Sequence, residues 1–358
     1  MQQEHIKPRC FVHSGKIEFG LDKVVSSVAV VTKNGIETGE ISVGFEDSSL
    51  VVVSNQELEQ GRLKPEKLYI STDSNFPVVD HCWYGKSLVC ITSGKSIMIY
   101  DYENNRVVHT LIGHLDFILC LKKGPLENLL VSAGDDRSIM VWDLRTFKPI
   151  NYILAHSSAI TSLDVFKDSS IILSTSDEGY ARMWDMHNGE CLRTLSAFNT
   201  PPIVQGKFTL NSDLSLFATL DGKVSLFNMR TGRLIREYMG HINKEFILDI
   251  VFTKNSKQDL DGFIIGSENG MILRFNWQQT TPIDCLHVEE DGLASDLIQI
   301  VGNQLYVSGR GWSCLSRVEY PLDAVSSNQN MNLLVKNTSR HTAAGQQLNS
   351  FNSVTESL

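Results

Sequence analysis

The sequence predicts an all-β protein folded as a seven-bladed β-propeller. Three segments, Ile99-Tyr100-Asp101, Val141-Trp142-Asp143 and Met183-Trp184-Asp185, each close an apolar run of β-forming residues, and their aromatic residues recur every 42 residues. That period is the length of one four-stranded propeller blade. Weaker copies of the unit continue the period in both directions. Seven units close a ring without leaving a long unpaired strand edge.

The third unit carries the whole pattern of residue types. It contains Gly113-His114, a strand with Ser132, a turn with Asp136, and Trp142 near the end of the next strand. This spacing predicts a hydrogen-bond chain from the turn carboxylate through a buried histidine and a strand hydroxyl to the tryptophan N–H. Such a chain stabilises a protein when every buried polar group has a partner. We therefore expect His114, Asp136 and Trp142 to be structural and not catalytic.

The following units repeat this pattern with substitutions. The fourth unit has Glu178 at the position of the turn aspartate, and the fifth and sixth end in Phe227 and Phe275 in place of tryptophan. We expect these later blades to replace the polar chain by apolar packing. The residues expected at the same structural positions are His156, Trp184, Asp221 and His241.

Two flanking units and the chain ends complete the organisation. The seven units end near Val53, Tyr100, Trp142, Trp184, Phe227, Phe275 and Glu319. We expect a propeller over residues 23–323, preceded by an N-terminal segment, residues 1–22, and followed by a polar tail, residues 324–358, that is mostly disordered. Either of two segments could pair in the last blade and close the ring, Arg9–His13 or Met331–Val335.

Composition excludes several classes of protein. The net charge is −9, without the clustered Lys and Arg that phosphate binding requires, so direct sequence-specific binding of nucleic acid is not expected. No apolar stretch reaches the ~20 residues of a membrane span. Seven scattered cysteines without a C-x-x-C pair favour reduced thiols. No nucleophile, metal-ligand or phosphate-loop motif is present, so we expect no enzyme, no metal and no cofactor.

The units resemble WD repeats, and about half of the chain, from about Val107 to Asn276, resembles a narrower family. Residues 174–195, the Pro201-Pro202 insertion, the Thr219-Leu220-Asp221 turn and Gly240-His241 are similar to the propeller subunit of COMPASS-type histone lysine methyltransferase complexes. The resemblance implies a nuclear, non-catalytic scaffold, present as a single copy in a hetero-oligomer. Its implied partners are the methyltransferase subunit and a companion WD-repeat subunit.

The resemblance implies a first binding surface at the top of the central channel. Relatives clamp a partner's arginine there between two phenylalanines, and the matching positions are Leu119 and Asp249, with Thr161 between them. Phe117 and Phe246 keep aromatic character near the rim. The channel therefore either binds an arginine in a modified pocket, with Asp249 as an acceptor, or binds none.

A second implied surface lies on the bottom face between the fifth and sixth blades, where relatives hold an acidic and aliphatic peptide. Leu226 and Phe252 could equally be core residues, whereas the amide of Asn211 and the cation of Arg236 are harder to explain by packing. The matching residues are Asn211, Leu214, Leu226, Arg236 and Phe252.

A second functional class stays open on the sequence alone. WD-repeat adaptors of other assemblies, such as a ubiquitin-ligase substrate receptor or a trafficking scaffold, share the same spacing of blades. We expect co-purified subunits to separate these two classes.

Overall fold

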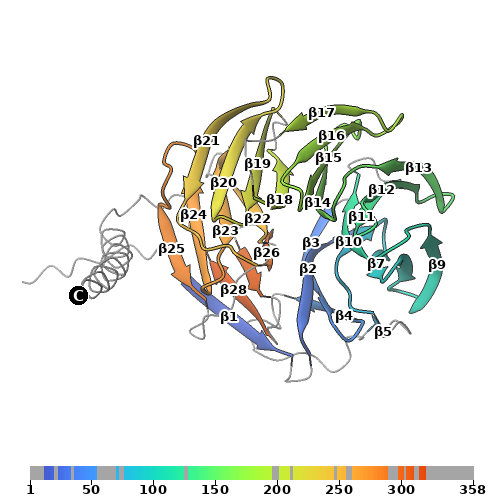
Figure 1. Ribbon diagram of the computed structural model, residues 1–358. Helices are drawn as coiled ribbons and strands as arrows, with labels where there is room; N and C mark the ends of the chain where they lie inside the picture. The colour runs from blue at the N-terminus through green and yellow to red at the C-terminus, as the bar shows by residue number, and fades with distance from the viewer. Residues whose placement is uncertain are drawn as a thin grey trace, which may run out of the picture.

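The computed structural model is a closed ring of seven antiparallel sheets around a central channel (Figure 1). It describes residues 12–19, 23–33, 36–54, 70–71, 76–124, 128–195, 201–209, 213–245, 248–254, 260–288, 297–301, 304–309 and 314–319. These residues contain strands and turns and no helix, so none could cross a membrane as a helix. The sequence prediction of an all-β, seven-bladed propeller is confirmed. The predicted tail, residues 324–358, lies outside the described residues, as does Met331–Val335.

Each of the first six blades contains four strands that follow one another along the chain. The first two blades comprise β2 (Val25–Lys33), β3 (Ile36–Phe45), β4 (Ser49–Ser54) and β5 (Ile70–Ser71), then β6 (His81–Tyr84), β7 (Leu88–Ser93), β8 (Ser96–Asp101) and β9 (Arg106–Ile112). The next two comprise β10 (Ile118–Lys123), β11 (Leu129–Gly134), β12 (Ser138–Asp143) and β13 (Lys148–Leu154), then β14 (Ile160–Val165), β15 (Ile171–Ser176), β16 (Ala181–Asp185) and β17 (Cys191–Leu195). The fifth and sixth comprise β18 (Ile203–Phe208), β19 (Leu214–Thr219), β20 (Lys223–Asn228) and β21 (Arg233–Met239), then β22 (Ile250–Lys254), β23 (Leu260–Gly266), β24 (Met271–Asn276) and β25 (Asp284–His287).

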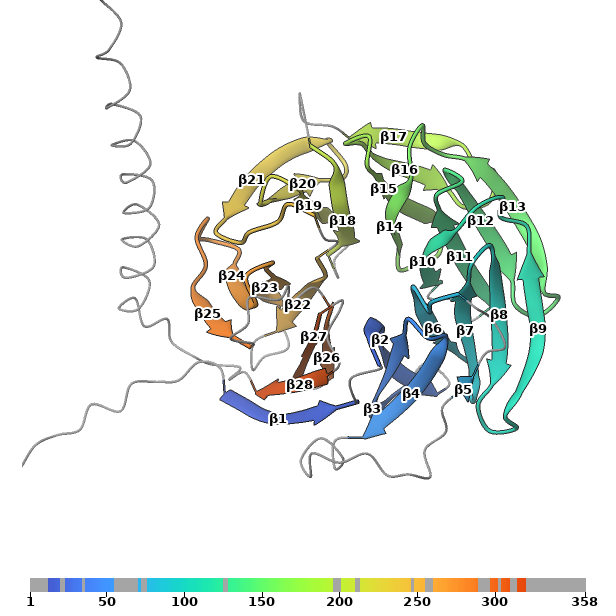
Figure 2. The same ribbon diagram turned by 60° about the horizontal axis from the view of Figure 1, so that its bottom comes forward.

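The seventh blade joins the two ends of the propeller. It consists of β26 (Leu297–Val301), β27 (Gln304–Ser308), β28 (Cys314–Glu319) and the N-terminal strand β1 (Val12–Glu18). Figure 2 shows β1 lying along β28, with which it pairs antiparallel from Val12 to Glu18. The closing strand therefore comes from the N-terminal side, and it extends further along the chain than the sequence interpretation placed it. Pairing of distant segments removes two free sheet edges and closes the ring.

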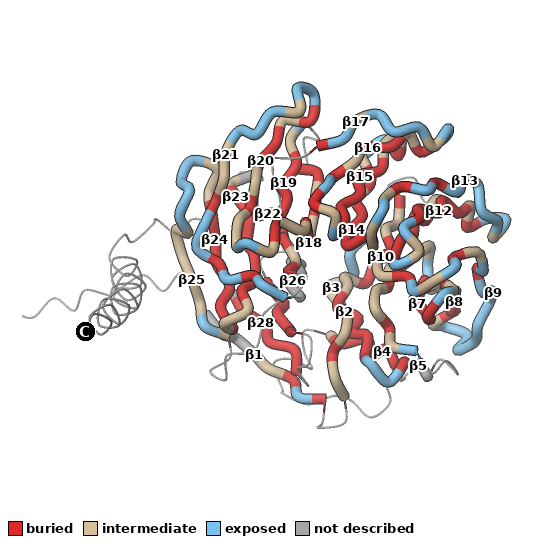
Figure 3. Tube along the Cα trace, in the orientation of Figure 1, coloured by how far each residue is buried: buried red, intermediate tan, exposed pale blue. Residues whose placement is uncertain are grey.

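The apolar core is divided among the spaces between neighbouring blades. Successive side chains of a strand point to opposite faces of its sheet, so each blade packs on both neighbours. In the third blade Val131 and Val141 pack against the fourth blade, whereas Leu130, Met140 and Trp142 pack against the second. The buried apolar residues among those described form seven such clusters, one for each pair of neighbouring blades. Figure 3 shows the consequence: the inner strands are mostly buried and the outer strands mostly exposed.

One turn position repeats around the ring with a left-handed backbone. The turns between the second and third strands place Arg137, Gly179, Gly222 and Gly270 at equivalent positions, with φ angles of 65°, 80°, 75° and 75°. Glycine adopts this conformation without a steric cost, and Arg137 does not. These tight turns hold the acidic residues of the repeat at one end of each blade.

Candidate functional site

The third blade contains the hydrogen-bond chain that its residue pattern predicts. His114 Nδ1 lies 2.7 Å from Asp136 Oδ2, and His114 Nε2 lies 2.7 Å from the Ser132 hydroxyl. Trp142 Nε1 donates to the same hydroxyl at 2.8 Å. Burial by itself would raise the pKa of Asp136, but hydrogen bonds from His114 and Ser138 hold this pKa well below its usual value. The carboxylate is therefore an anion that accepts a hydrogen bond from His114 Nδ1–H, and it is part of the framework of the blade.

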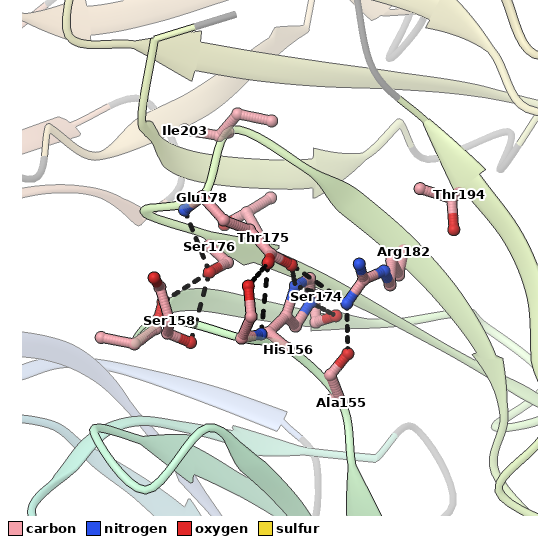
Figure 4. Close-up of polar contacts among 12 residues, drawn as sticks. Ala155, His156, Ser158, Ser174, Thr175, Ser176, Glu178, Arg182, Thr194 and Ile203 are labelled. Atoms are coloured by element: carbon pink, nitrogen blue, oxygen red, sulfur yellow. Dashed lines mark hydrogen bonds and ion pairs between the residues drawn. The ribbon is translucent and has the colours of Figure 1, made fainter.

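The fourth blade repeats this chain with a longer carboxylate, that of Glu178. Figure 4 shows His156 next to Ser174 and Arg182 in this blade. His156 lies 2.6 Å from Glu178 through Nδ1 and 2.7 Å from the Ser174 hydroxyl through Nε2. Trp184 Nε1 donates to Ser174 at 2.8 Å, and Arg182 pairs with Glu178 at 3.0 Å. Burial lowers the pKa of His156 to about 4, despite the hydrogen bond to Glu178. The neutral ring is thus a structural group at neutral pH.

The fifth and sixth blades do not continue the polar chain, as their sequence substitutions predict. His241 is buried, and neither of its ring nitrogens has a hydrogen-bond partner among the described residues. Ile265 occupies the position of the strand hydroxyl, and Phe275 occupies that of the tryptophan. Asp221 stays in its turn, where Thr219 donates to it at 2.5 Å and Lys223 pairs with it at 2.9 Å.

A further histidine chain links the first two blades, and the sequence pattern did not identify it. His81 contacts the Ser27 hydroxyl through Nδ1 at 2.9 Å and the Ser42 hydroxyl through Nε2 at 2.8 Å. Trp83 Nε1 donates to Ser42 at 2.8 Å. The alternation His81-Cys82-Trp83 could have identified this chain, because it places both rings on one face of a strand. The 42-residue period does not include these positions.

The central channel contains a cavity of about 350 Å³. Leu119 and Thr161 both line it, and each is the extra residue of a β-bulge in β10 or β14. Thr161 is buried, and its hydroxyl donates to the Ile203 carbonyl at 2.6 Å. Phe117 does not line the cavity, and Phe246 lies outside the described residues. The structure therefore brings Leu119, Thr161 and Asp249 to one cavity, as their alignment implies.

Charged side chains link successive blades around this cavity. Asp249 accepts hydrogen bonds from Lys207 Nζ at 2.6 Å and from Gln205 Nε2 at 2.9 Å. Lys122 lies 3.5 Å from Asp164, whose carboxylate raises the pKa of Lys122. An arginine entering the channel would compete with Lys207 for Asp249, and its binding stays a prediction.

A different carboxylate of the cavity, Asp80, is in contact with no cation of the described residues. It accepts backbone N–H groups of Leu121 at 2.7 Å and His81 at 2.8 Å. Burial raises the pKa of Asp80 to about 6. The sequence interpretation did not include Asp80 in the channel.

The bottom surface between the fifth and sixth blades is built on one apolar cluster. Leu214, Phe252 and Trp277 are partly buried and pack against it, and the ring centroids of Phe252 and Trp277 lie 6.3 Å apart. Leu226 is only 5% exposed and belongs to the core, so this residue has little surface to offer a partner. Asn211 lies outside the described residues.

Arg236 has a structural partner within the propeller. Its guanidinium donates to the Trp277 carbonyl at 2.9 Å and to the Gln278 carbonyl, across the boundary between the blades. Equivalent outer-strand residues contact the turn of the next blade in the same way: His109 stacks on Phe147, and Asn151 donates to the His187 carbonyl at 3.5 Å. Arg236, which the alignment assigned to the bottom surface, therefore links the fifth and sixth blades.

Comparison with known families identifies the repeat. Residues 105–143 and 147–185 match the family model described as WD domain, G-beta repeat. These two segments are WD repeats. Together with the seven-bladed ring, they support assignment of the chain to the WD-repeat family. Each matched segment begins with the outer strand of one blade and continues through three strands of the next, so every WD repeat joins two neighbouring blades.

The WD repeats on a propeller suggest a protein-interaction scaffold. In the described part of the chain, no group of three or more His, Cys, Asp and Glu residues could hold a metal ion. The histidines of the WD repeats are used in the framework, while the channel, the bottom surface and the exposed turns remain accessible to partners.

Proposed function

We propose that this WD-repeat propeller is a non-catalytic scaffold subunit of a COMPASS-like histone methyltransferase complex in the nucleus. It binds the methyltransferase subunit and a companion WD-repeat subunit, is present as a single copy, and thereby supports histone lysine methylation at chromatin. The resemblance of the fourth to sixth blades to such subunits, above all the Pro201-Pro202 insertion and the Thr219-Leu220-Asp221 turn, supports this assignment.

The observation that carries the proposal is the partly exposed apolar surface between the fifth and sixth blades. Leu214 and Phe252 keep exposed area beside Trp277, at the place where relatives hold an extended acidic and aliphatic peptide. Aliphatic side chains of such a peptide would bury this area, and its backbone would pair with polar groups of the surrounding turns. Arg236 contributes by fixing the Trp277 turn through its Nη1 group.

One observation favours the alternative, a WD-repeat adaptor of another assembly such as a ubiquitin-ligase substrate receptor or a trafficking scaffold. The top channel has Leu119 and Asp249 where relatives place two phenylalanines, and Asp249 is already hydrogen-bonded to Lys207. A guanidinium would lose both aromatic faces in this channel.

Mass spectrometry of the native complex purified through the tagged full-length chain tests the proposal. We expect histone methyltransferase subunits in stoichiometric amounts. Recovery of ligase or coat components in their place would establish the alternative, and turnover of a substrate by the purified chain alone would contradict a scaffold role.

A substitution on the bottom surface tests the site within the same complex. Leu214→Asp places a charge on the apolar contact and is expected to weaken the binding of one subunit by about 2 kcal/mol, the size of an interface anchor. Leu192→Asp is the matched control, because Leu192 is 49% exposed on the outer strand β17. Circular dichroism confirms folding of both variants. Equal retention of all subunits by Leu214→Asp and the parent chain would remove the bottom surface from the proposal.

A further inference from the structure

A second apolar surface lies where the second blade passes into the third, outside the central cavity. Three large side chains are exposed to solvent on it: Phe76 by 43%, Leu115 by 72% and Phe117 by 40%. We call this group, together with the neighbouring Asp116, Asp135 and Asp177, the Phe117 surface. None of its six side chains lines the channel cavity.

The apolar side chains of the Phe117 surface are held by the blade turns beneath them. The rings of Phe76 and Phe117 meet edge to face with centroids 5.8 Å apart. Phe76 lies over Gly94, where an added Cβ would approach the ring to 3.0 Å. The Phe117 carbonyl accepts the Asp135 N–H at 2.9 Å, and the Leu115 N–H donates to Asp136 at 2.9 Å. A preformed aromatic pair that stays exposed is typical of protein-binding surfaces.

The charge next to these rings is negative. Within the described residues, the carboxylates of Asp135 and Asp177 form neither a hydrogen bond nor an ion pair. Partial burial raises the pKa of Asp135, and the charges that add to this effect are those of Asp116, Asp177 and Asp136. Burial also raises the pKa of Asp177.

Two cations lie on the same turns. Lys95 lies 3.4 Å from Asp116 and donates to the Leu115 carbonyl at 2.8 Å, and Arg137 is exposed beside Asp136. Asp135 and Asp177 are thus exposed carboxylates beside an apolar contact, with no cation of the described residues paired to them. A cation delivered by a ligand would complement them.

We propose that the Phe117 surface docks a basic segment of a partner protein, with an aliphatic or aromatic side chain on Phe76 and Phe117 and a lysine or arginine side chain beside Asp135 and Asp177. The proposal rests on the scaffold function proposed above and adds a docking site distinct from the channel and the bottom surface. The negative charge of the surface opposes the binding of nucleic acid and of anionic lipid.

Fluorescence anisotropy with the full chain and a labelled peptide of three Lys-Leu-Arg-Phe repeats tests the proposal. We expect saturable binding that weakens as salt is raised, because exposed ion pairs are screened. A peptide of Glu-Leu-Asp-Phe repeats is expected not to bind, and one of Lys-Ser-Arg-Ser repeats is expected to bind at least about tenfold more weakly, since it lacks the apolar anchor. Equal binding of the acidic peptide would overturn the charge argument.

Variants locate the binding on the propeller. Leu115→Ser combined with Phe117→Ser removes the apolar contact, and Asp135→Asn combined with Asp177→Asn removes the charge at nearly constant shape. Each pair is expected to raise Kd at least about tenfold. Leu234→Ser combined with Ile235→Ser is the matched control, because these residues are 43% and 51% exposed on β21, and its Kd is expected to match that of the parent chain.

Several outcomes would overturn the proposal. They are an unchanged Kd in the folded asparagine variant, an equal loss in the control pair, and self-association of the parent chain in sedimentation that the serine variant abolishes. The last result would make a second copy of the chain the occupant. The peptide measurement requires no complex, so binding on this surface without methyltransferase subunits in the purified complex would refute the proposed function and leave the docking site standing.

Discussion

Replacing Ser132 by alanine removes the hydroxyl on which the hydrogen-bond chain of the third blade is centred. This hydroxyl lies 2.7 Å from His114 Nε2 and accepts Trp142 Nε1–H at 2.8 Å. Asp136 faces Nδ1 of the ring, and the Ser132 hydroxyl, whose oxygen accepts from Trp142, has its hydrogen directed at Nε2. Ser132 is fully buried, and His114 and Trp142 are 6% and 1% exposed, so water cannot replace the lost hydroxyl without rearrangement.

The expected loss follows from the two groups left without a partner. A buried donor or acceptor that loses its hydrogen bond costs about 1–3 kcal/mol. Ser132→Ala leaves one acceptor and one donor in this state, so the free energy of unfolding should fall by about 2–6 kcal/mol. The whole stability of a typical domain is about 5–15 kcal/mol, so the change should be large.

Urea unfolding followed by circular dichroism measures the effect, with Ser215→Ala as the matched control. Ser215 is also fully buried in a strand, but its hydroxyl has no hydrogen-bond partner among the described residues. Its removal should therefore leave the urea midpoint unchanged or raise it slightly. The reasoning would be refuted if Ser132→Ala unfolded at the same urea concentration as the parent, or if Ser215→Ala were equally damaging.

Two further predictions concern pH and backbone packing. Burial lowers the pKa of His81 and of His156 to about 4, whereas a histidine of the unfolded chain has a pKa of about 6.5. The free energy of unfolding should therefore fall as the pH is lowered from about 6.5 toward 4. The loss is at most about 1.4 kcal/mol per pH unit for each histidine. Burial raises the pKa of Asp80 to about 6, and protonation of this carboxyl opposes part of the loss. Urea midpoints measured at several pH values should depend less steeply on pH for His81→Asn than for the parent. An unchanged pH dependence would contradict the lowered pKa of His81. Gly134→Ala places a Cβ 2.0 Å from a backbone oxygen and should lower the free energy of unfolding by about 2 kcal/mol or more. Gly124→Ala should cost less, because the nearest atom to its added Cβ lies at 3.1 Å. Equal melting temperatures for the two variants would refute this reasoning.

The part of the site that the sequence predicted is local in the chain. The chain from Asp136 through His114 and Ser132 to Trp142 lies within one WD repeat, where hairpin turns set the strand register. His241 has the same sequence landmark, yet its ring has no hydrogen-bond partner in the part of the chain that the structure describes, because Ile265 and Phe275 replace the serine and the tryptophan of the chain. A motif of two residues therefore predicts position in the blade but not the hydrogen bonds made there.

The sequence by itself determined the blade period, the number of blades and the alternation that turns each strand toward two neighbours, because these depend on strand periodicity and turn spacing. Only the tertiary structure decided the contacts between blades: the pairing of β1 with β28, the engagement of Asp249 by Lys207, and the use of Arg236 as a tie to the Trp277 turn. These contacts depend on the twist of each sheet and its rotation about the channel axis. A repeat pattern that is the same in every blade does not predict these contacts between blades.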